Sequence, residues 1–168
     1  SIVLLKNESL LPVDTRKFKK ILVTGPNANN QSIMGDWVFE QPEKNVSTIL
    51  EGIKEEASGT QINYVDVGWN MRALDSAKIE EAIQTAKSSD LAIVIVGEDS
   101  FRQHWKEKTC GENRDRMDIT LWGKQDYLVE SIYKTGVPTI VILINGRPLA
   151  TRWIAENIPA VIEAWEPG

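Results

Sequence analysis

The residues best suited to acid and base chemistry lie on one long polar segment, residues 97–123. It contains Glu98, Glu107 and Glu112, and a carboxyl group can donate or accept a proton during catalysis. Glu98 directly follows an apolar run, so we interpret it as a hydrogen-bonding residue at a sheet edge. Glu107 lies between two lysines, which is typical of a solvated charge. Glu112, among arginines, is therefore the favoured proton donor, and Glu98 and Glu107 remain open as alternatives.

Other kinds of site have little support in the sequence. Cys110 is the only cysteine and His104 the only histidine, which excludes an internal disulfide and makes a poor metal site. Cys110 could be a reactive thiol, but an ordinary small loop residue is favoured because no thiolate-imidazole pair is indicated. Neither a Gly-x-Gly-x-x-Gly, a Gly-Lys-Ser/Thr nor a Gly-x-Ser-x-Gly pattern occurs. We expect no metal and no cofactor.

Composition places limits on the partners. The chain has 168 residues, 42% of them hydrophobic, which is enough for one core, so we expect one domain over residues 1–168. The net charge of −5 and the pI near 5.0 give no basic field, which makes nucleic acid an improbable partner. No apolar run approaches the roughly 20 residues that span a bilayer, so no membrane insertion is expected.

Apolar and helical patterns alternate along the chain. Strands are predicted at residues 21–24, 62–67, 91–96, 139–144 and 160–164. Helices are predicted at residues 46–53, 79–86, 125–133 and 149–154. This order is typical of parallel β-α-β units. We predict an α/β fold, a three-layer α/β/α sandwich with a mostly parallel sheet of five to six strands.

The carboxyl ends of parallel strands meet at one sheet edge, and the residues that follow these strands are rich in glycine, carboxylate, amide and tryptophan. Such a mixture suits a polyhydroxylated ligand, because polar groups bind its hydroxyls and aromatic faces pack on its C–H side. Glycine and asparagine are also simply common at strand ends. Both interpretations stay open at this point.

Five motifs resemble the second domain of glycoside hydrolase family 3 enzymes, in order and in spacing. They are residues 1–7 with Leu11-Pro12, Val96-Gly97-Glu98, Gly111-Glu112 with Arg116 and Asp118-Ile119, residues 145–149 (Asn-Gly-Arg-Pro-Leu), and residues 164–168 (Ala-Trp-Glu-Pro-Gly). Enzymes of this family are retaining, exo-acting β-glycosidases, usually β-glucosidases or β-xylosidases, built from a TIM barrel and an α/β sandwich. The resemblance implies that this chain is the sandwich.

The resemblance also implies roles for individual residues. In the family a barrel aspartate is the nucleophile and a sandwich glutamate is the acid/base, and Glu112 matches that glutamate. Residues 34–37 resemble a glycine-tryptophan loop near the pocket mouth, so Trp37 is expected either to contact the leaving-group sugar or to pack in the core or between domains. Glu98 and Arg116 lie in the matching motifs, and we expect them to contact substrate. A periplasmic or secreted location is what the family suggests.

The same resemblance predicts that the chain is a fragment, without the upstream barrel and the C-terminal completion of the sandwich. We expect it to be inactive alone and to partner a carbohydrate substrate and the barrel of the same parent chain. We also expect an uncovered edge strand or the barrel-facing surface to allow homodimers. The alternative, from another class, is a non-catalytic carbohydrate-binding or interaction module of the same fold.

Overall fold

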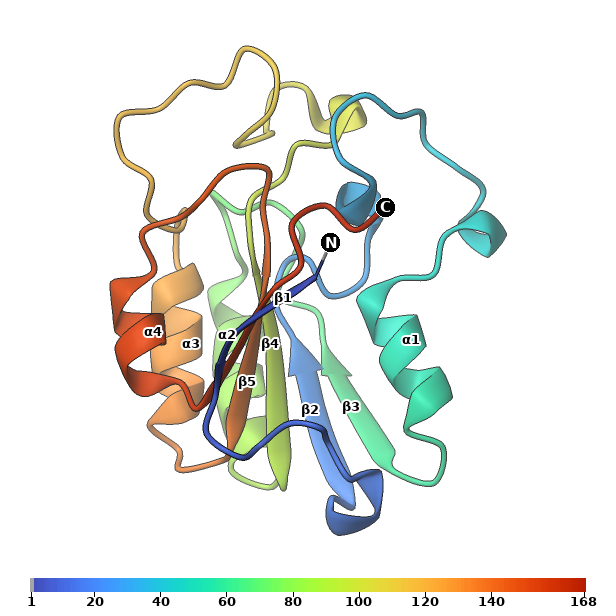
Figure 1. Ribbon diagram of the computed structural model, residues 1–168, viewed down its shortest axis with the longest axis vertical. Helices are drawn as coiled ribbons and strands as arrows, with labels where there is room; N and C mark the ends of the chain where they lie inside the picture. Colours follow the sequence, from blue (N-terminus) through green and yellow to red (C-terminus); the bar gives the residue numbers. More distant parts are fainter. Residues whose placement is uncertain (1) are drawn as a thin grey trace.

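The computed structural model describes residues 2–168 and shows an α/β fold with a six-stranded mixed sheet. The strand order is β1-β6-β5-β4-β2-β3 (Figure 1). All neighbouring pairs are parallel except β1 with β6. The strands are β1 Val3–Asn7, β2 Lys20–Thr24, β3 Gln61–Val65, β4 Leu91–Gly97, β5 Thr139–Ile144 and β6 Ala160–Glu163. The helices are α1 Ile49–Glu56, α2 Ser76–Ala86, α3 Gln125–Tyr133 and α4 Arg152–Asn157.

Helices cover both faces of the sheet, which confirms the predicted fold class. In Figure 1, α2, α3 and α4 lie on one side and α1 on the other. The central strands β4 and β5 are apolar on both faces because each face packs against a core. One core holds Ile79 of α2 and Leu128 of α3, and the other holds Leu50 of α1.

Local hydrogen bonds explain where the element bounds differ from the predicted ones. The first helix begins at Ile49 because Thr48 and Glu51 form a reciprocal capping box. The third strand ends at Val65, since the Val67 carbonyl accepts the Asp75 N–H at 2.9 Å outside the ladder. The last helix starts at Arg152 because the segment before it is hydrogen bonded to the long loop.

The sequence did not indicate β1. It pairs antiparallel with β6, with Leu4 opposite Ile162, so β6 is an internal strand and β1 forms that edge. Ser1, which opens the family-like segment, lies outside the described residues. Ile2 and Leu5 are 69% and 56% exposed, so apolar side chains stay accessible here.

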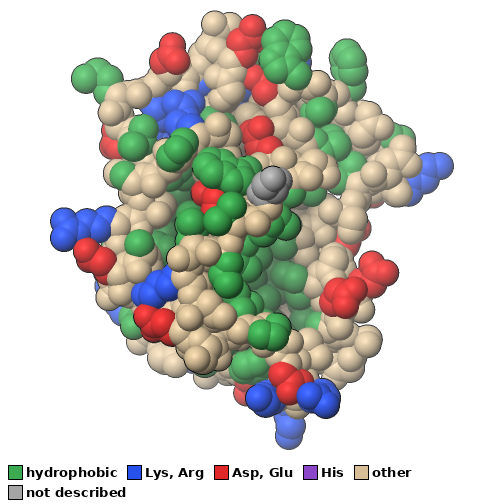
Figure 2. Space-filling view, viewed as in Figure 1, with side chains coloured by type: hydrophobic (Ala, Val, Ile, Leu, Met, Phe, Trp, Pro, Cys, Tyr) green, Lys and Arg blue, Asp and Glu red, His purple; other side chains and the backbone are tan. Residues whose placement is uncertain are grey.

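The α1 side of the sheet is covered unevenly. A single helix lies there, and Ile142 of β5 and Ile162 of β6 are only partly buried. Figure 2 shows hydrophobic side chains in a hollow at the centre of this view, between the regions of β1 and α1. The molecule therefore presents an apolar face next to an open sheet edge.

Candidate active site

The loop that carries the three glutamates leaves the sheet at Gly97, the last residue of β4. Gly97 has a φ of +153°, and a Cβ added there would lie 1.9 Å from the carbonyl oxygen of Ile144. Any side chain would collide with the backbone of β5. The glycine lets the chain turn away and puts Glu98 at the carboxyl edge of the sheet, where open α/β folds hold their sites.

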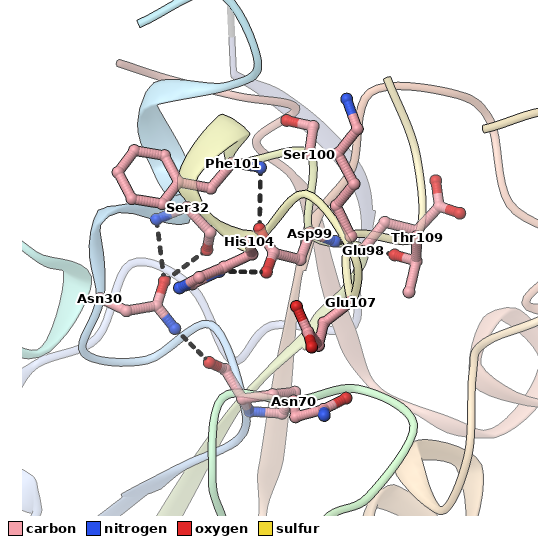
Figure 3. Close-up of polar contacts among 12 residues, drawn as sticks. Asn30, Ser32, Asn70, Glu98, Asp99, Ser100, Phe101, His104, Glu107 and Thr109 are labelled. Carbon is pink, nitrogen blue, oxygen red and sulfur yellow. Dashed lines mark hydrogen bonds and ion pairs between the residues drawn. The ribbon is translucent and has the colours of Figure 1, made fainter. Parts of the chain in front are cut away.

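Asp99 closes the first turn of this loop (Figure 3). Its Oδ1 accepts the Phe101 N–H at 2.9 Å, and its own N–H donates to Thr109 Oγ1 at 2.9 Å. Its Oδ2 lies 2.5 Å from Nδ1 of His104. The carboxylate is almost fully buried. Residues 99–109 thus form a turn held by its own hydrogen bonds. This turn fixes the position at which the following residues, including Glu112, begin.

The second anchor of the loop is Asp36, which belongs to the connection between β2 and α1. Asp36 Oδ2 accepts the Glu112 N–H at 2.6 Å and lies 2.9 Å from Nζ of Lys108, whose side chain is fully buried. Gly111 permits this approach, because its φ is +85° and a Cβ there would lie 2.5 Å from Asp36 Oδ2. A residue distant in the sequence therefore holds the main chain of Glu112.

The surroundings of Asp36 favour its charged form. Burial alone would raise the pKa of this carboxyl, but the Lys108 ammonium, the Glu112 N–H and the Arg102 guanidinium together lower the pKa below its ordinary value. The distance from Arg102 Nε to Asp36 Oδ1 is 3.8 Å. Asp36 is therefore ionised, and its carboxylate links the β2–α1 connection to the loop after β4.

The side chain of Glu112 reaches solvent and meets Arg102. Glu112 Oε2 accepts from Nη2 of Arg102 at 2.9 Å, and 42% of the Glu112 side chain is exposed. The guanidinium also lies 3.8 Å from the centre of the Trp37 ring, a cation-π contact. Trp37 itself is 75% exposed. Arg102 thus brings the carboxylate and an exposed aromatic face to one surface.

Glu98 belongs to a separate, buried ion cluster. Its Oε1 accepts from Nη1 of Arg116 at 3.0 Å, and its Oε2 lies 3.2 Å from Nε of Arg147. Arg116 also donates to the carbonyl of Thr120 at 2.7 Å. The cluster therefore joins the end of β4, the far part of the loop and the segment after β5.

The pKa values and the exposed surface favour different glutamates. Burial raises the pKa of Glu98, and Arg147 and Arg116 oppose this without reversing it. A raised pKa is one mark of a general acid. The Glu98 side chain, however, has no exposed surface. A general acid must come within hydrogen-bond distance of the substrate, so accessibility favours Glu112.

Cys110 is buried next to this cluster. Burial raises the pKa of its thiol, and the Glu98 and Glu166 carboxylates raise it further. A thiol that is hard to ionise is a weak nucleophile. The geometry supports the interpretation of Cys110 as an ordinary packed residue.

The structure places the four predicted site residues in two groups. Glu112 and Trp37 lie on either side of the Arg102 guanidinium at the surface. Glu98 and Arg116 pair with each other, and the Arg116 side chain is 10% exposed. Contact of Trp37, Glu98 and Arg116 with substrate, and the catalytic role of Glu112, stay predictions.

Three residues of this arrangement were missed in the sequence. Asp36 and Arg102 had no motif of their own, and their link to Glu112 depends on folding. Lys108 lies in a Lys-Glu-Lys run that is typical of a solvated surface, yet its side chain is fully buried. The Gly-Asp-Trp sequence that contains Asp36 was the one signal that could have indicated it.

Within residues 2–168, no group of three or more His, Cys, Asp or Glu side chains is arranged to hold a metal ion. Over the same described range, no helix is both long enough and apolar enough to cross a membrane.

Fold and loop together define an α/β sandwich domain whose long loop after β4 presents the accessible carboxylate of Glu112. Residues 2–168 match the family described as the glycosyl hydrolase family 3 C-terminal domain. The chain belongs to this family.

Similar proteins carry the names of β-xylosidases and β-glucosidases. The chain is 40% identical over 177 residues to a β-xylosidase of Formosa agariphila, covering 100% of this chain and 23% of that protein. It is 30% identical over 189 residues to a periplasmic β-glucosidase of Salmonella typhimurium, covering 100% of this chain and 24% of that one. A crystal structure of a β-glucosidase from Listeria innocua in complex with glucose matches with a TM-score of 0.84 and 28% identity, over 100% of this chain and 22% of that one. The chain thus spans about a quarter of these relatives.

Proposed function

We propose that this chain is the acid/base-bearing sandwich domain of a retaining, exo-acting β-glycosidase that removes terminal β-linked glucose or xylose. The single observation that carries the proposal is the geometry of Glu112: its main chain is fixed by Asp36, its carboxylate is held by Arg102, and the side chain is accessible. Family membership and the names of the relatives support the reaction class.

Retention of configuration requires two carboxyl groups about 5–5.5 Å apart across the glycosidic bond. In the first step one carboxylate attacks the anomeric carbon while Glu112 gives its proton to the leaving oxygen. In the second step Glu112 takes a proton from water, and the oxygen of that water displaces the enzyme carboxylate. We assign the nucleophile to a TIM barrel of the same parent chain, so the pocket forms between the two domains. The reaction needs no cofactor.

The residues around Glu112 have positioning roles in this scheme. Asp36 fixes the position of the loop by accepting the Glu112 N–H, and the buried Lys108 ammonium holds the Asp36 carboxylate in turn. Arg102 orients the carboxylate and stacks on Trp37. An exposed indole beside a proton donor is suited to pack against the leaving sugar. We therefore assign Trp37 to the leaving-group side of the pocket.

Glu98 and Arg116 fit a supporting role more directly than a binding one. Their ion pair and the Arg147 contact connect the start of the loop with its later part and with the segment after β5. Arg147, with 24% of its side chain exposed, is the member of the cluster closest to reaching a ligand. Substrate contact by Glu98 or Arg116 would require the cluster to rearrange.

We further propose that copies of the chain associate through β1. This strand is an edge, where backbone groups on one side are unpaired, and an apolar face lies beside it. A second copy could extend the sheet and cover that face.

The role of Glu112 is tested in the full parent enzyme with Glu112→Gln. A good aryl leaving group needs little protonation, so activity on an aryl β-glycoside should fall far less than activity on a β-linked disaccharide. Removing a general acid typically lowers the rate by about 10²–10⁴-fold on the substrate that needs it. Glu107→Gln, a glutamate change on the same loop, is the matched control and should lower neither. Equal activity of Glu112→Gln and wild type on both substrates would move the acid/base elsewhere.

A further inference from the structure

A pocket of about 390 Å³ lies among the loops that follow β2, β3 and β4. Its volume is within the range of small-molecule sites, about 300–1,000 Å³. Glu112, Trp37 and Arg102 are not among its lining residues. The residues that define it here are Asn30, Glu40, Glu43, Asp66, Trp69 and His104. We call it the switch-point pocket, for the position described next.

The topology of the sheet gives this pocket a special place. β2 lies between β3 and β4; the chain passes from β2 by way of α1 to β3, and from β4 by way of α3 to β5 on the opposite side. Two connections that start at neighbouring strands and run apart leave a crevice between them, and open α/β sheets bind ligands there. Asn30 follows β2 and His104 follows β4, so both borders of the crevice line the pocket.

The floor of the pocket is aromatic and fixed. The rings of Trp69 and His104 are stacked, with centroids 3.9 Å apart and planes at 20°. The buried Asp99 carboxylate holds Nδ1 of His104, and Figure 3 shows the other ring nitrogen on the side of Asn30. Trp69 is 40% exposed. The floor therefore offers an accessible indole and one imidazole nitrogen that Asp99 does not occupy.

The walls carry oxygen atoms and amides but no cation. Glu40, Glu43 and Asp66 line the pocket together with the Asn30 amide, and neither lysine nor arginine contributes. Carboxylates accept hydrogen bonds from hydroxyl groups, whereas the Asn30 amide already accepts from Ser32 and donates to the Pro26 carbonyl. An anionic ligand would meet only like charges. An aromatic floor with acceptor-rich walls fits a neutral, hydroxylated ring.

We propose that the switch-point pocket binds a neutral pyranose unit of a carbohydrate, stacked on the face of Trp69 that His104 does not cover and hydrogen bonded by the carboxylates. The site does not take part in bond cleavage. It goes beyond the proposed function, because it would hold a sugar whether or not Glu112 acts as the acid/base.

The test is a titration of the ¹⁵N-labelled 168-residue chain, followed by two-dimensional NMR, with methyl β-D-glucopyranoside, methyl β-D-xylopyranoside, the methyl β-glycoside of glucuronic acid, and tetramethylammonium. We expect saturable shifts of the Trp69 indole and Asn30 amide signals with the two neutral glycosides, and binding of the glucuronide weaker by about tenfold or more. Equal binding of the glucuronide, binding of the ammonium ion alone, or no saturable shift with either neutral glycoside would overturn the proposal.

Variants locate the binding. Trp69→Ala should weaken it by at least about tenfold, as loss of a stacking residue does at binding sites. Glu43→Ala changes an exposed residue of a short 3₁₀ turn, so folding is not at risk, and it should weaken binding by about fivefold. Tyr127→Ala, which removes a half-exposed aromatic ring from α3, is the matched control and should change nothing. Full binding by both pocket variants would contradict the assignment.

Glu112→Gln separates this proposal from the proposed function. It should leave the sugar-induced shifts of the chain unchanged while it impairs disaccharide cleavage by the parent enzyme. If binding is lost in Glu112→Gln, the sugar occupies the Glu112 surface, and the switch-point pocket is not the site.

Discussion

The main chain and the side chain of Glu112 are held by different partners, and this suits a residue that must gain and lose a proton. Asp36 takes the N–H and Arg102 takes the carboxylate, so the position of the loop does not depend on the state of the acid. A proton donor that also serves as the base must change protonation twice in each cycle. In the proposed mechanism, the backbone hydrogen bond to Asp36 keeps Glu112 in place through both changes.

Gly111 tests how closely the two loops must approach. Gly111→Ala adds a Cβ that would lie 2.5 Å from Asp36 Oδ2, whereas the Cβ of Gly136→Ala enters open space at the same φ of +85°. Gly136→Ala should lower the free energy of unfolding by about 1–2 kcal/mol from backbone strain alone. Gly111→Ala should lower it by a further 1–3 kcal/mol or so, measured by urea unfolding. Equal losses would mean that the contact with Asp36 is loose.

Asp36 predicts a pH dependence. Because its pKa is lowered in the folded protein, its stabilising effect is present above its ordinary pKa of about 3.9 and is lost as the pH falls through the folded value. Asp36→Asn leaves the buried Lys108 ammonium without its charge partner and should destabilise the chain by about 3 kcal/mol at pH 7. The difference from wild type should shrink below pH 4. Asp14→Asn, at an exposed pair with Arg16, is the control and should have little effect. A pH-independent difference for Asp36→Asn would contradict the account.

At the residue scale the sequence predicted an acid, Glu112, but not the residues that hold it. A carboxylate on a long loop after a buried strand is a local pattern, and the family resemblance singled out Glu112 among the three glutamates. Asp36 lies 76 residues away in the chain, and Lys108 resembles a surface lysine until the fold buries it. Pairings of this kind depend on tertiary contacts, which a local sequence pattern cannot predict.

At the scale of elements, periodicity was informative inside the sheet and weak at its edge. β4 and β5 are continuous apolar runs because both faces are buried, and the sequence shows this directly. β1 begins with three apolar residues but ends in Lys6 and Asn7. It is mostly exposed, and it pairs with β6 from the far end of the chain. Its apolar residues looked like part of a family motif. They gave no local sign of strand pairing.

β1 predicts self-association. Leu5 is 56% exposed at the irregular point of the β1 ladder, so Leu5→Lys should leave the fold intact and place a charge on the edge. The weight-average mass of the wild-type chain should rise toward that of a dimer with concentration, and Leu5→Lys should stay monomeric, both measured by light scattering. Tyr127→Lys on α3 is the control and should behave as wild type. A monomeric wild type at high concentration would refute pairing through β1.

For the whole molecule, the central prediction is that catalysis is divided between domains. The chain matches about a quarter of the length of its relatives, and its favoured candidate acid, Glu112, is accessible on an anchored loop. A retaining mechanism needs a second carboxylate at a set distance across the substrate. The fold class followed from the order of elements alone. The sugar specificity did not, and we expect it to depend on the proposed barrel as well.

The chain by itself should therefore release no nitrophenol from aryl β-glucosides or β-xylosides. Tight sugar binding is not expected at the Glu112 surface, because half of a pocket buries too little of a ligand. The purified chain would turn over substrate only if both carboxylates lay within it. Turnover that scales with its concentration and disappears in Glu112→Gln would therefore contradict the proposal that two domains share the catalytic residues. Micromolar binding of a sugar at the Glu112 surface would instead favour a binding module.

The most direct test of the role of Glu112 is azide rescue in the parent enzyme. In Glu112→Gln the glycosyl-enzyme forms from an aryl glycoside but lacks a base to activate water, and azide needs no such base. The account predicts that added azide restores turnover and yields the β-glycosyl azide, identified by NMR. Turnover that azide does not change, with the free sugar as the sole product, would contradict Glu112 as the acid/base.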